Sequence, residues 1–302
     1  MNDIKALLGE RIPQLKVKEN LMLSTCTSFR TGGPADAGAY PETSDELREL
    51  LMLCGQEGVP FYILGNGTNV LAPDEGFRGV MIFTSNMREI VVDDETCEAR
   101  AGAGALLSAL AAECAKKELT GLEYARGIPG SVGGAVVMNA GAYGGEIKDS
   151  LISVRVMDER GGQPFEMSNA ELELGYRHSI IPERRLVVLE ALFGLKKGDR
   201  ESIYGLMDEL SARRKEKQPL EFPSAGSTFK RPDGYFAGKL IEDAGLKGFE
   251  TGGAQVSTKH AGFVINKGGA TSSDIKKLIE EVQKRVFENS GVRLETEVRY
   301  IP

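Results

Sequence analysis

The sequence is poor in the residues that most often bind metal ions. Its four cysteines, Cys26, Cys54, Cys97 and Cys114, are widely separated and form no C-x-x-C pair, and only two histidines accompany them. This pattern does not support a zinc site. We therefore expect no bound metal, and we expect the cysteines to be small buried hydrophobic residues.

The shortage of histidine also limits nucleophilic catalysis. A Ser-His-Asp triad would need His178 or His260, and no G-x-S-x-G motif accompanies either residue. His178 directly follows Arg177 and is expected to be a positioning residue. His260 is expected to be a loop residue or a substrate contact.

Long apolar runs are absent as well. Residues Met1–Lys5 have no apolar core of a secretion signal, and no run approaches the roughly 18 apolar residues of a membrane span. The net charge of −7 and the pI near 5.2 argue against a nucleic-acid or anionic-membrane partner. We expect a soluble, cytoplasmic protein with no obligate protein partner, in which local donors hold any bound phosphate.

Glycine, by contrast, is abundant, with 37 copies among 302 residues. The longest concentration is Gly127–Gly145, and a second, Leu64–Leu71, follows the strand-like run Val59–Leu64. Glycine can point successive backbone N–H groups at phosphate oxygens, so both segments predict a binding surface for a ligand with a diphosphate. Neither matches the P-loop or the G-x-G-x-x-G fingerprint. A pair of tight turns is the alternative.

The apolar pattern predicts three parts, residues 1–85, 86–198 and 199–302, with the polar stretch Lys196–Arg200 marking the last boundary. The helices expected in the first two parts are Asp3–Leu8, a helix capped by Ser44 that carries Leu47, Leu50, Leu51 and Cys54, and Leu106–Lys117. The extended segments expected there are Phe61–Leu64, Val80–Phe83, Glu89–Arg100, Ile152–Met157 and Leu186–Phe193.

The last part has the pattern of a smaller α+β domain. Its three expected helix faces are Ile203, Leu206, Met207 and Leu210, then Phe236, Leu240 and Ile241, then Ile275, Leu278, Ile279, Val282 and Val286. Ser272 or Ser273 is the expected cap of the third helix, and Ala261–Ile265 and Val292–Tyr300 are the expected strands.

Three polar residues are candidates for catalysis because each lies in a glycine-rich or strand-end context without an evident structural role. They are Arg177, Ser227 and Glu297. Taken singly, each has a structural alternative: an ion-pair arginine, a turn hydroxyl and an outward-facing strand residue. Glu295 and Glu297 fall on one face of the expected strand, so spacing alone does not choose between the two carboxylates.

Six motifs occur in this order: Thr27–Ala35, Leu64–Asn69, Gly127–Gly134, Tyr176–Ser179, Ala225–Lys230 and Glu297–Arg299. Together they resemble the UDP-N-acetylenolpyruvoylglucosamine reductase family of flavoproteins, the MurB family. The resemblance extends from about Ser24 to Tyr300. The glycine loops alone would indicate only the wider vanillyl-alcohol-oxidase type of FAD fold.

This resemblance implies an α+β protein with a two-subdomain FAD-binding module of the PCMH type and a smaller C-terminal substrate-binding domain. It implies that FAD binds non-covalently and that NADPH reduces it. UDP-N-acetylglucosamine enolpyruvate would then be reduced to UDP-N-acetylmuramate, a peptidoglycan precursor. Because the segment between Ser179 and Arg213 is short, the chain resembles the branch that lacks a tyrosine-bearing substrate loop.

The resemblance also implies roles for individual residues. Ser227 would donate a proton to carbon, while Arg177 and Glu297 would polarise the substrate carboxylate and share its developing charge. The implied substrate contacts are Tyr176, Lys217, Lys230 and His260, with Arg213 and Arg214 as either diphosphate contacts or a solvated basic helix end. The implied FAD contacts are Arg30, Thr31, Gly65, Asn66, Gly67, Thr68, Asn69, Val70, Ile128, Pro129, Gly130, Ser131, Gly133, Gly134, Asn139, Gly141, Ala142 and Tyr143.

Two other classes of protein share part of this pattern. A flavin oxidase would match the glycine loops but gives no reason for Tyr176–Ser179 or Gly226–Thr228. A nucleotide-binding module without catalysis would match the loops and show no flavin turnover. The reductase is the interpretation that accounts for all six motifs.

Overall fold

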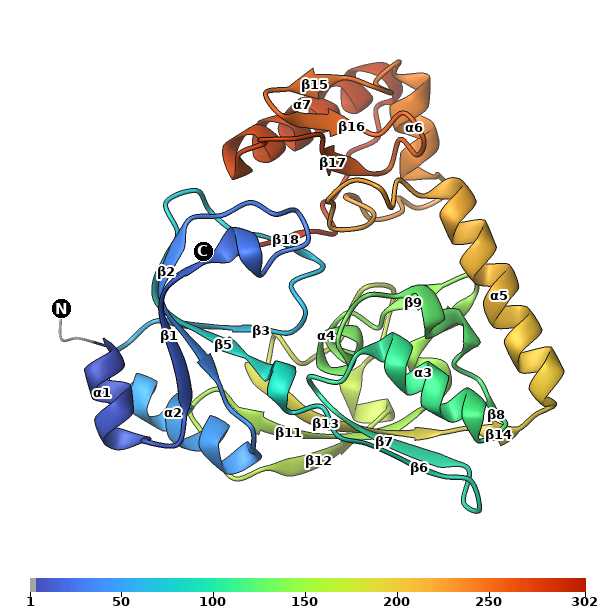
Figure 1. Cartoon of the computed structure of the whole chain (residues 1–302). Coiled ribbons are helices and arrows are strands. Elements are labelled where there is room, and N and C mark those ends of the chain that lie inside the picture. The colour runs from blue at the N-terminus through green and yellow to red at the C-terminus, as the bar shows by residue number, and fades with distance from the viewer. Residues whose placement is uncertain (1–3) are drawn as a thin grey trace. The chain divides into compact units, whose positions relative to one another are not determined.

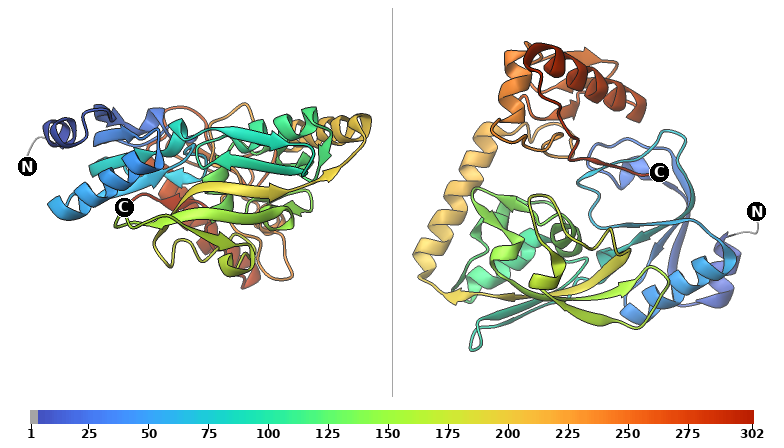
Figure 2. Two further views of the ribbon diagram at one scale, coloured as in Figure 1. Left: turned by 90° about the horizontal axis from the view of Figure 1, so that it is seen from below. Right: turned by 180° about the vertical axis from the view of Figure 1, so that it is seen from behind.

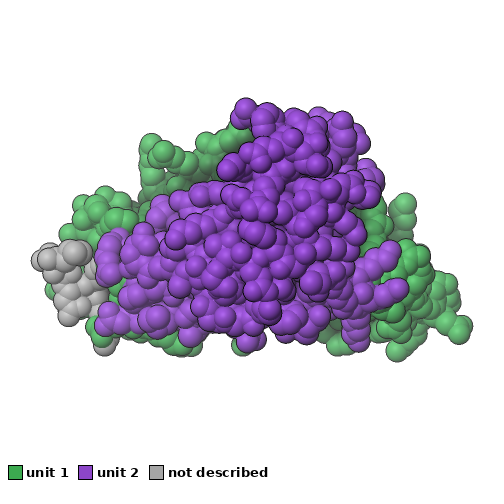
Figure 3. Space-filling model, turned by 90° about the horizontal axis from the view of Figure 1, so that it is seen from above, with its two compact units in different colours: residues 1–19, 36–66, 79–213 green, residues 20–35, 67–78, 214–302 purple. Residues whose placement is uncertain are grey.

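The computed structural model describes residues 4–302, and the contacts among them form two compact units. Unit 1 contains the described part of Met1–Glu19 together with Asp36–Asn66 and Gly79–Arg213, and unit 2 contains Asn20–Ala35, Gly67–Arg78 and Arg214–Pro302. Figure 3 colours the two units separately. Two early segments are thus grouped with the C-terminal residues.

The predicted parts 1–85, 86–198 and 199–302 follow the order of the chain, whereas the contact grouping interleaves it. The last change from unit 1 to unit 2 falls after Arg213, inside helix α5 (Arg200–Lys217), and not at the polar stretch Lys196–Arg200. The three-part division therefore stays a prediction.

A four-stranded sheet contains the early strands. Its order is β1 (Lys16–Met22), β2 (Pro34–Tyr40), β5 (Phe77–Phe83) and β3 (Phe61–Leu64), with β3 and β5 parallel. Helices α1 (Ile4–Arg11) and α2 (Ser44–Glu57) contribute Leu8, Leu47 and Leu50 to the core that contains Val80 and Ile82. The strands predicted at Phe61–Leu64 and Val80–Phe83 are confirmed, and so is the first helix, except that Asp3 lies outside the described residues.

The predicted cap of α2 is wrong by one residue. Thr43, not Ser44, is the N-cap: its hydroxyl accepts a hydrogen bond from the backbone N–H of Glu46 at 3.1 Å, and its own backbone is extended. Ser44 is already helical. Both residue types suit the position, so the sequence alone does not separate them.

A five-stranded antiparallel sheet forms the larger part of unit 1. Its order is β12 (Phe165–Ser168), β11 (Leu151–Asp158), β13 (Leu186–Gly194), β7 (Glu98–Gly102) and β6 (Ile90–Asp93). Helices α3 (Leu107–Lys116) and α4 (Val132–Val137) lie on one face of it (Figures 1 and 2). The remaining short elements of unit 1 are η2 (Thr84–Asn86), β8 (Leu119–Thr120), η3 (Glu123–Gly127), β9 (Gly141–Ala142), β10 (Gly145–Glu146), η4 (Ile147–Asp149), η5 (Ala170–Leu172) and β14 (Lys196–Lys197).

These elements confirm the predicted helix Leu106–Lys117 and the strands near Ile152–Met157 and Leu186–Phe193. The extended stretch Glu89–Arg100 is the β6–β7 hairpin. The helix α4 inside the glycine-rich segment was not predicted, because paired glycines have low helix propensity and hide the signal. Tertiary packing overrides that propensity, since Val132 and Val136 are buried in the core.

Unit 2 is built around helix α7 (Ser272–Ser290) and a small antiparallel sheet. The sheet has the order β15 (Glu250–Thr251), β16 (Ala254–Val256) and β17 (Val264–Asn266). The other elements are η1 (Leu23–Thr25), β4 (Val70–Leu71), which pairs in parallel with β18 (Arg299–Tyr300), and α6 (Ala237–Asp243). The predicted apolar face of α7 is confirmed, because Ile275, Leu278, Ile279, Val282 and Val286 are all buried.

Both predicted C-terminal strands are shorter than expected. The stretch Ala261–Ile265 becomes strand only at Val264, because the backbone N–H of Phe263 bonds the His260 carbonyl in a turn. Of Val292–Tyr300 only Arg299–Tyr300 is strand, and Thr296 forms a single bridge with Phe229.

The cap predicted for α7 is also wrong. Thr271 is the N-cap, and it forms a capping box with Asp274: each side chain accepts a hydrogen bond from the other's backbone N–H at 3.0 Å. Ser272 and Ser273 are the first helical residues, and their N–H groups bond elsewhere.

Two residues assigned to buried helix faces are exposed. Leu206 in α5 is 43% exposed, although Ile203, Met207 and Leu210 are buried. Phe236 precedes α6 and is 62% exposed, with the Arg231 guanidinium 4.0 Å from the centre of its ring.

Among the helices of residues 4–302, none is long and apolar enough to span a membrane.

The cysteines are buried in part. Cys54 and Cys114 are buried, and burial raises the pKa of their thiols to about 11 and about 12. Cys26 and Cys97 are half-buried, so the prediction of four buried cysteines is right for two.

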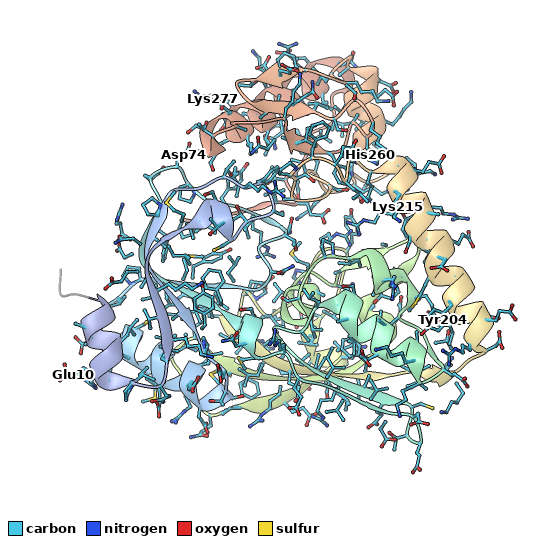
Figure 4. The ribbon with its side chains drawn as sticks, viewed as in Figure 1. Glu10, Asp74, Tyr204, Lys215, His260 and Lys277 are labelled. Carbon is cyan, nitrogen blue, oxygen red and sulfur yellow. The ribbon has the colours of Figure 1, made fainter. Side chains whose placement is uncertain are left out.

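One carboxylate joins an early segment of unit 2 to α7. Asp74 accepts hydrogen bonds from the backbone N–H groups of Ser272 at 2.7 Å and Ser273 at 2.9 Å, and from the Ser273 hydroxyl at 2.7 Å (Asp74 is labelled in Figure 4). Partial burial raises the pKa of Asp74, but the hydrogen bonds from Ser273 and Ser272 outweigh it and lower the pKa below its usual value. A negative charge at this helix terminus also suits the helix dipole.

We predict that Asp74→Asn destabilises the protein at neutral pH, because it removes the charge that accepts hydrogen bonds from Ser272 and Ser273. The expected loss in the free energy of unfolding is only about 1 kcal/mol, because Asp74 is exposed and solvent screens its charge. Because folding lowers the pKa of Asp74, its contribution is complete above the unfolded-state pKa of about 4 and is lost as the pH falls through the folded-state value. Urea unfolding of both proteins between pH 3 and pH 7 measures the difference. Asp233→Asn, at an exposed carboxylate, is the control, and a difference that does not shrink at low pH contradicts the prediction.

Candidate active site

The two glycine loops predicted from the sequence meet in unit 1. After β3 ends at Leu64, Gly65 lies so close to Ser131 that a Cβ on Gly65 would be 2.2 Å from the Ser131 hydroxyl oxygen. Asn66 donates from Nδ2 to the Pro129 carbonyl at 2.6 Å. The end of β3 and the long glycine segment are therefore in direct contact.

The start of α4 is packed on the five-stranded sheet. Ser131 is buried and caps α4, its hydroxyl accepting a hydrogen bond from the Gly134 N–H at 3.3 Å. Gly133 donates to the Ala103 carbonyl at 2.8 Å, and a Cβ on Gly133 would be 2.9 Å from the Ala103 Cβ. Only glycine fits this approach. Pro129 and Gly134, by contrast, are exposed and accessible to a ligand.

The end of the glycine segment is a tight hairpin. β9 and β10 pair Gly141 with Glu146 and Ala142 with Gly145, and Tyr143 and Gly144 form the turn with φ of 53° and 92°. Glycine tolerates a positive φ, whereas tyrosine pays a steric cost there. Tyr143 is 45% exposed, so its ring does not compensate for that cost by burial.

Arg177 lies in a second tight turn of unit 1. Gly175 and His178 exchange backbone hydrogen bonds at 3.2 Å, which leaves Tyr176 and Arg177 at the tip. Arg177 has a φ of 54°, its Nη2 donates to the Gly141 carbonyl at 3.2 Å, and its guanidinium is 5.1 Å from the centre of the Tyr176 ring. Tyr176 is exposed and Arg177 is half-buried. The arginine is therefore oriented by its own unit.

Backbone strain coincides with the candidate residues. Nine described residues other than glycine have a positive φ, and four of them, Arg30, Asn139, Tyr143 and Arg177, were selected from the sequence as site residues. Such conformations cost about 1–2 kcal/mol each and tend to occur at functional sites. This observation is independent of the motifs.

In unit 2, Arg30 and Thr31 lie in a loop held against Gly67. The Ser28 N–H bonds the Gly67 carbonyl at 2.9 Å, and a Cβ on Gly67 would be 2.0 Å from the Cys26 carbonyl oxygen. The hydroxyls of Ser28 and Thr31 are buried, and neither has a hydrogen-bond partner among the described residues. Buried hydroxyls normally have partners. The hydroxyls of Ser28 and Thr31 could therefore each form a hydrogen bond with a bound ligand.

Ser227 and Glu297 are also brought together in unit 2. The Glu297 N–H bonds the carbonyl of Thr228 at 2.8 Å, next to the exposed Ser227. Asn69 Nδ2 donates to the Glu297 carbonyl at 3.1 Å, so a predicted FAD-contact segment touches a predicted catalytic one. Glu295 differs from Glu297: its side chain is 75% exposed and pairs with Lys230 Nζ at 3.3 Å.

The predicted substrate contacts have different surroundings. Lys217 is the exposed last residue of α5, and Arg213 and Arg214 lie in the last turns of the same helix. His260 lies near the C-terminal end of α5, where Lys215 is labelled in Figure 4, and the Lys259 ammonium donates to the Lys215 carbonyl at 2.7 Å. Burial lowers the pKa of His260, and its Nδ1 accepts a hydrogen bond from the Gly262 N–H at 3.1 Å. The ring is therefore neutral near pH 7, with its proton on Nε2.

Each unit thus collects part of the predicted set. Unit 1 holds Gly65, Asn66, the glycine segment and the Tyr176–Arg177 turn, while unit 2 holds Arg30, Thr31, the Gly67–Val70 segment, Ser227, Glu297 and the basic substrate contacts. Sequence reasoning missed Ser28 and Glu146, because a buried hydroxyl without a partner and an acceptor for a buried amide are visible only in three dimensions. The structure also bears on metal binding. Among residues 4–302, no three or more His, Cys, Asp or Glu side chains are grouped so that they could hold a metal ion.

Two family models match the chain. "FAD binding domain" matches residues 35–167, and "UDP-N-acetylenolpyruvoylglucosamine reductase, C-terminal domain" matches residues 218–301. The first covers the glycine loops and the second covers Ser227 and Glu297.

Curated relatives match over almost the whole chain. UDP-N-acetylenolpyruvoylglucosamine reductase of Clostridium novyi is 50% identical over 99% of this chain and 96% of the relative. The protein of the same name from Caldanaerobacter subterraneus is 50% identical over 97% of this chain and 96% of the relative.

Solved structures agree. The UDP-N-acetylenolpyruvylglucosamine reductase of Thermus caldophilus superposes with a TM-score of 0.82 at 36% identity, over 95% of this chain and 100% of that one. An Acremonium strictum glucooligosaccharide oxidase has a TM-score of 0.50 at 16% identity, over 98% of this chain and 60% of that one, which shows a shared fold alone. The comparisons thus favour the reductase over the oxidase and the binding module, and the chain belongs to the UDP-N-acetylenolpyruvoylglucosamine reductase (MurB) family.

Proposed function

We propose that this chain uses NADPH to reduce UDP-N-acetylglucosamine enolpyruvate to UDP-N-acetylmuramate, a precursor of peptidoglycan. The observation that carries the proposal is identity of 50% with curated reductases along 99% of the chain. Arg177, Ser227 and Glu297 all fall within the matched length. We propose that the enzyme acts in the cytoplasm.

The residues present fit FAD. A large polar cofactor needs close approach to backbone and polar groups to bind. Gly65 and Gly67 allow the first, Pro129 and Gly134 are exposed, and the buried hydroxyls of Ser28 and Thr31 have no partner among the described residues. When bound, FAD supplies a hydride acceptor for NADPH and a hydride donor for the enolpyruvyl double bond. No histidine precedes His178, so we propose that FAD is held without a histidyl link.

The proposed chemistry divides between protonation and charge stabilisation. Hydride addition to the methylene carbon pushes negative charge toward the substrate carboxylate, and the neighbouring carbon must then gain a proton. We assign the proton to the hydroxyl of Ser227, and the stabilisation to the Arg177 guanidinium and to a hydrogen bond donated by the carboxyl group of Glu297. Serine is a weak acid, so a permanent cation such as Arg177 is needed to lower the barrier.

Binding of the diphosphate needs local cations, because the net charge of the chain is −7. We propose Lys217 for this role, with Tyr176 and Lys230 as further substrate contacts. A neutral His260 with a proton on Nε2 is suited to donate a hydrogen bond without adding charge.

We predict that Ser227→Ala separates the two half-reactions. Reduction of the flavin by NADPH should stay close to the wild-type rate, while reoxidation by the enolpyruvyl substrate should slow by about 10²-fold or more, because only the second step needs the proton. Stopped-flow absorbance at the flavin band measures each step. Equal losses in both steps would mean that Ser227 is structural.

We predict unequal effects for the two neighbouring carboxylates. Glu297→Gln should slow flavin reoxidation by about 10²-fold with little change in substrate affinity, because glutamine still donates a hydrogen bond but cannot exchange a proton with the enolate. Glu295→Gln is the matched control, because Glu295 is exposed and pairs only with Lys230 among the interactions described above. The assignment moves to Glu295 if that variant is the slow one and both proteins melt normally.

A further inference from the structure

The turn that carries Arg177 is fixed at three points by one segment of unit 1. The Gly175 carbonyl accepts from Asn139 Nδ2 at 2.9 Å, and the Gly141 carbonyl accepts from Arg177 Nη2 at 3.2 Å. The Ser179 hydroxyl donates to the Val137 carbonyl at 2.8 Å. The place of the guanidinium is therefore set by the segment Val137–Gly141.

Asn139 is the buried residue of that segment, with no exposed surface and a φ of 40°. Besides Gly175, its Nδ2 donates to Glu146 Oε2 at 2.9 Å, and its Oδ1 accepts from the Lys148 N–H at 3.0 Å. Both amide hydrogens are thus used inside the protein, and none is left for a ligand. The side chain of Asn139 acts as a structural link, although the motif suggested a cofactor contact.

Glu146 provides the charged end of this link. Its carboxylate accepts from Asn139 and from the Asp149 N–H, and it pairs with the Lys148 ammonium at 2.9 Å. The Lys148 ammonium holds the pKa of Glu146 below its usual value, and the charge of Arg177 acts in the same direction. Glu146 is therefore an anion at neutral pH that fixes which way the Asn139 amide points, since a flipped amide would place its oxygen against two acceptors.

We propose that Glu146, acting through Asn139, is a positioning residue for Arg177 in the reduction of the enolpyruvyl substrate. The inference rests on the function proposed for Arg177. The contribution of Glu146 is to hold the strained turn, so that the guanidinium meets the substrate carboxylate in one orientation. Small displacements of such a group cost up to about 10²-fold in rate.

Rapid-mixing experiments on the FAD-loaded protein test the proposal. Glu146→Ala should slow flavin reoxidation by the enolpyruvyl substrate by about 10-fold, while flavin reduction by NADPH stays within about 2-fold. Glu146→Gln should recover most of the rate, because its amide oxygen still accepts from Asn139. Lys148→Ala is the control and should react as wild type, since the backbone N–H that bonds Asn139 remains.

A double variant separates positioning from a direct role. If Glu146 acts through Arg177, then Glu146→Ala should slow the wild type but not slow Arg177→Ala any further. Equal slowing in both backgrounds overturns the proposal, and so does a wild-type reoxidation rate in Glu146→Ala.

The same series distinguishes failure of this inference from failure of the proposed function. If the flavin of Arg177→Ala is reoxidised at the wild-type rate, the role proposed for Arg177 is wrong, and the inference about Glu146 is then wrong as well. If only Arg177→Ala is slow, the inference alone is wrong. Where Glu146→Ala does not retain FAD, Glu146→Asp takes its place, because the shorter side chain withdraws the carboxylate from Asn139, and a wild-type rate there overturns the proposal.

Discussion

At Gly65, Gly67 and Gly133, neighbouring segments approach so closely that a Cβ would collide with its surroundings. This constraint organises both units. In unit 1 it brings the end of β3 onto the start of α4, and in unit 2 it brings the Gly67 turn onto the Cys26–Ser28 loop. The close approaches are those of backbone without side chains, and such backbone can come near a diphosphate-containing cofactor.

The strained residues complete this framework. Arg30, Tyr143 and Arg177 adopt a conformation that is unfavourable for their residue types, and Asn139 adopts one that asparagine tolerates better. Asn139 and Arg177 are held in place by the hydrogen bonds that they donate to neighbouring segments. The chemistry that we propose calls for a cation aimed at one carboxylate, and a rigid turn would present the Arg177 guanidinium in a single orientation.

Sequence reasoning predicted most helices and strands because their apolar periodicity is strong, as in α7 and β13. It failed where local signals compete. Adjacent hydroxyl residues gave the wrong caps at Ser44 and Ser272, and the glycines of α4 hid a helix that packing stabilises. Motifs selected Arg177 and Asn139, but only the fold shows that the Asn139 amide is occupied by Glu146 and Gly175. The grouping of Gly67–Arg78 with the C-terminal residues is equally invisible in the sequence.

The central claim is that the flavin passes electrons from NADPH to the enolpyruvyl sugar nucleotide. Anaerobic absorbance measurement of the FAD-loaded protein tests it most directly. The account predicts that NADPH bleaches the flavin band, and that adding UDP-N-acetylglucosamine enolpyruvate restores it with formation of an equal amount of UDP-N-acetylmuramate. A flavin that stays reduced until oxygen is admitted, and then yields peroxide, would contradict the account and indicate an oxidase.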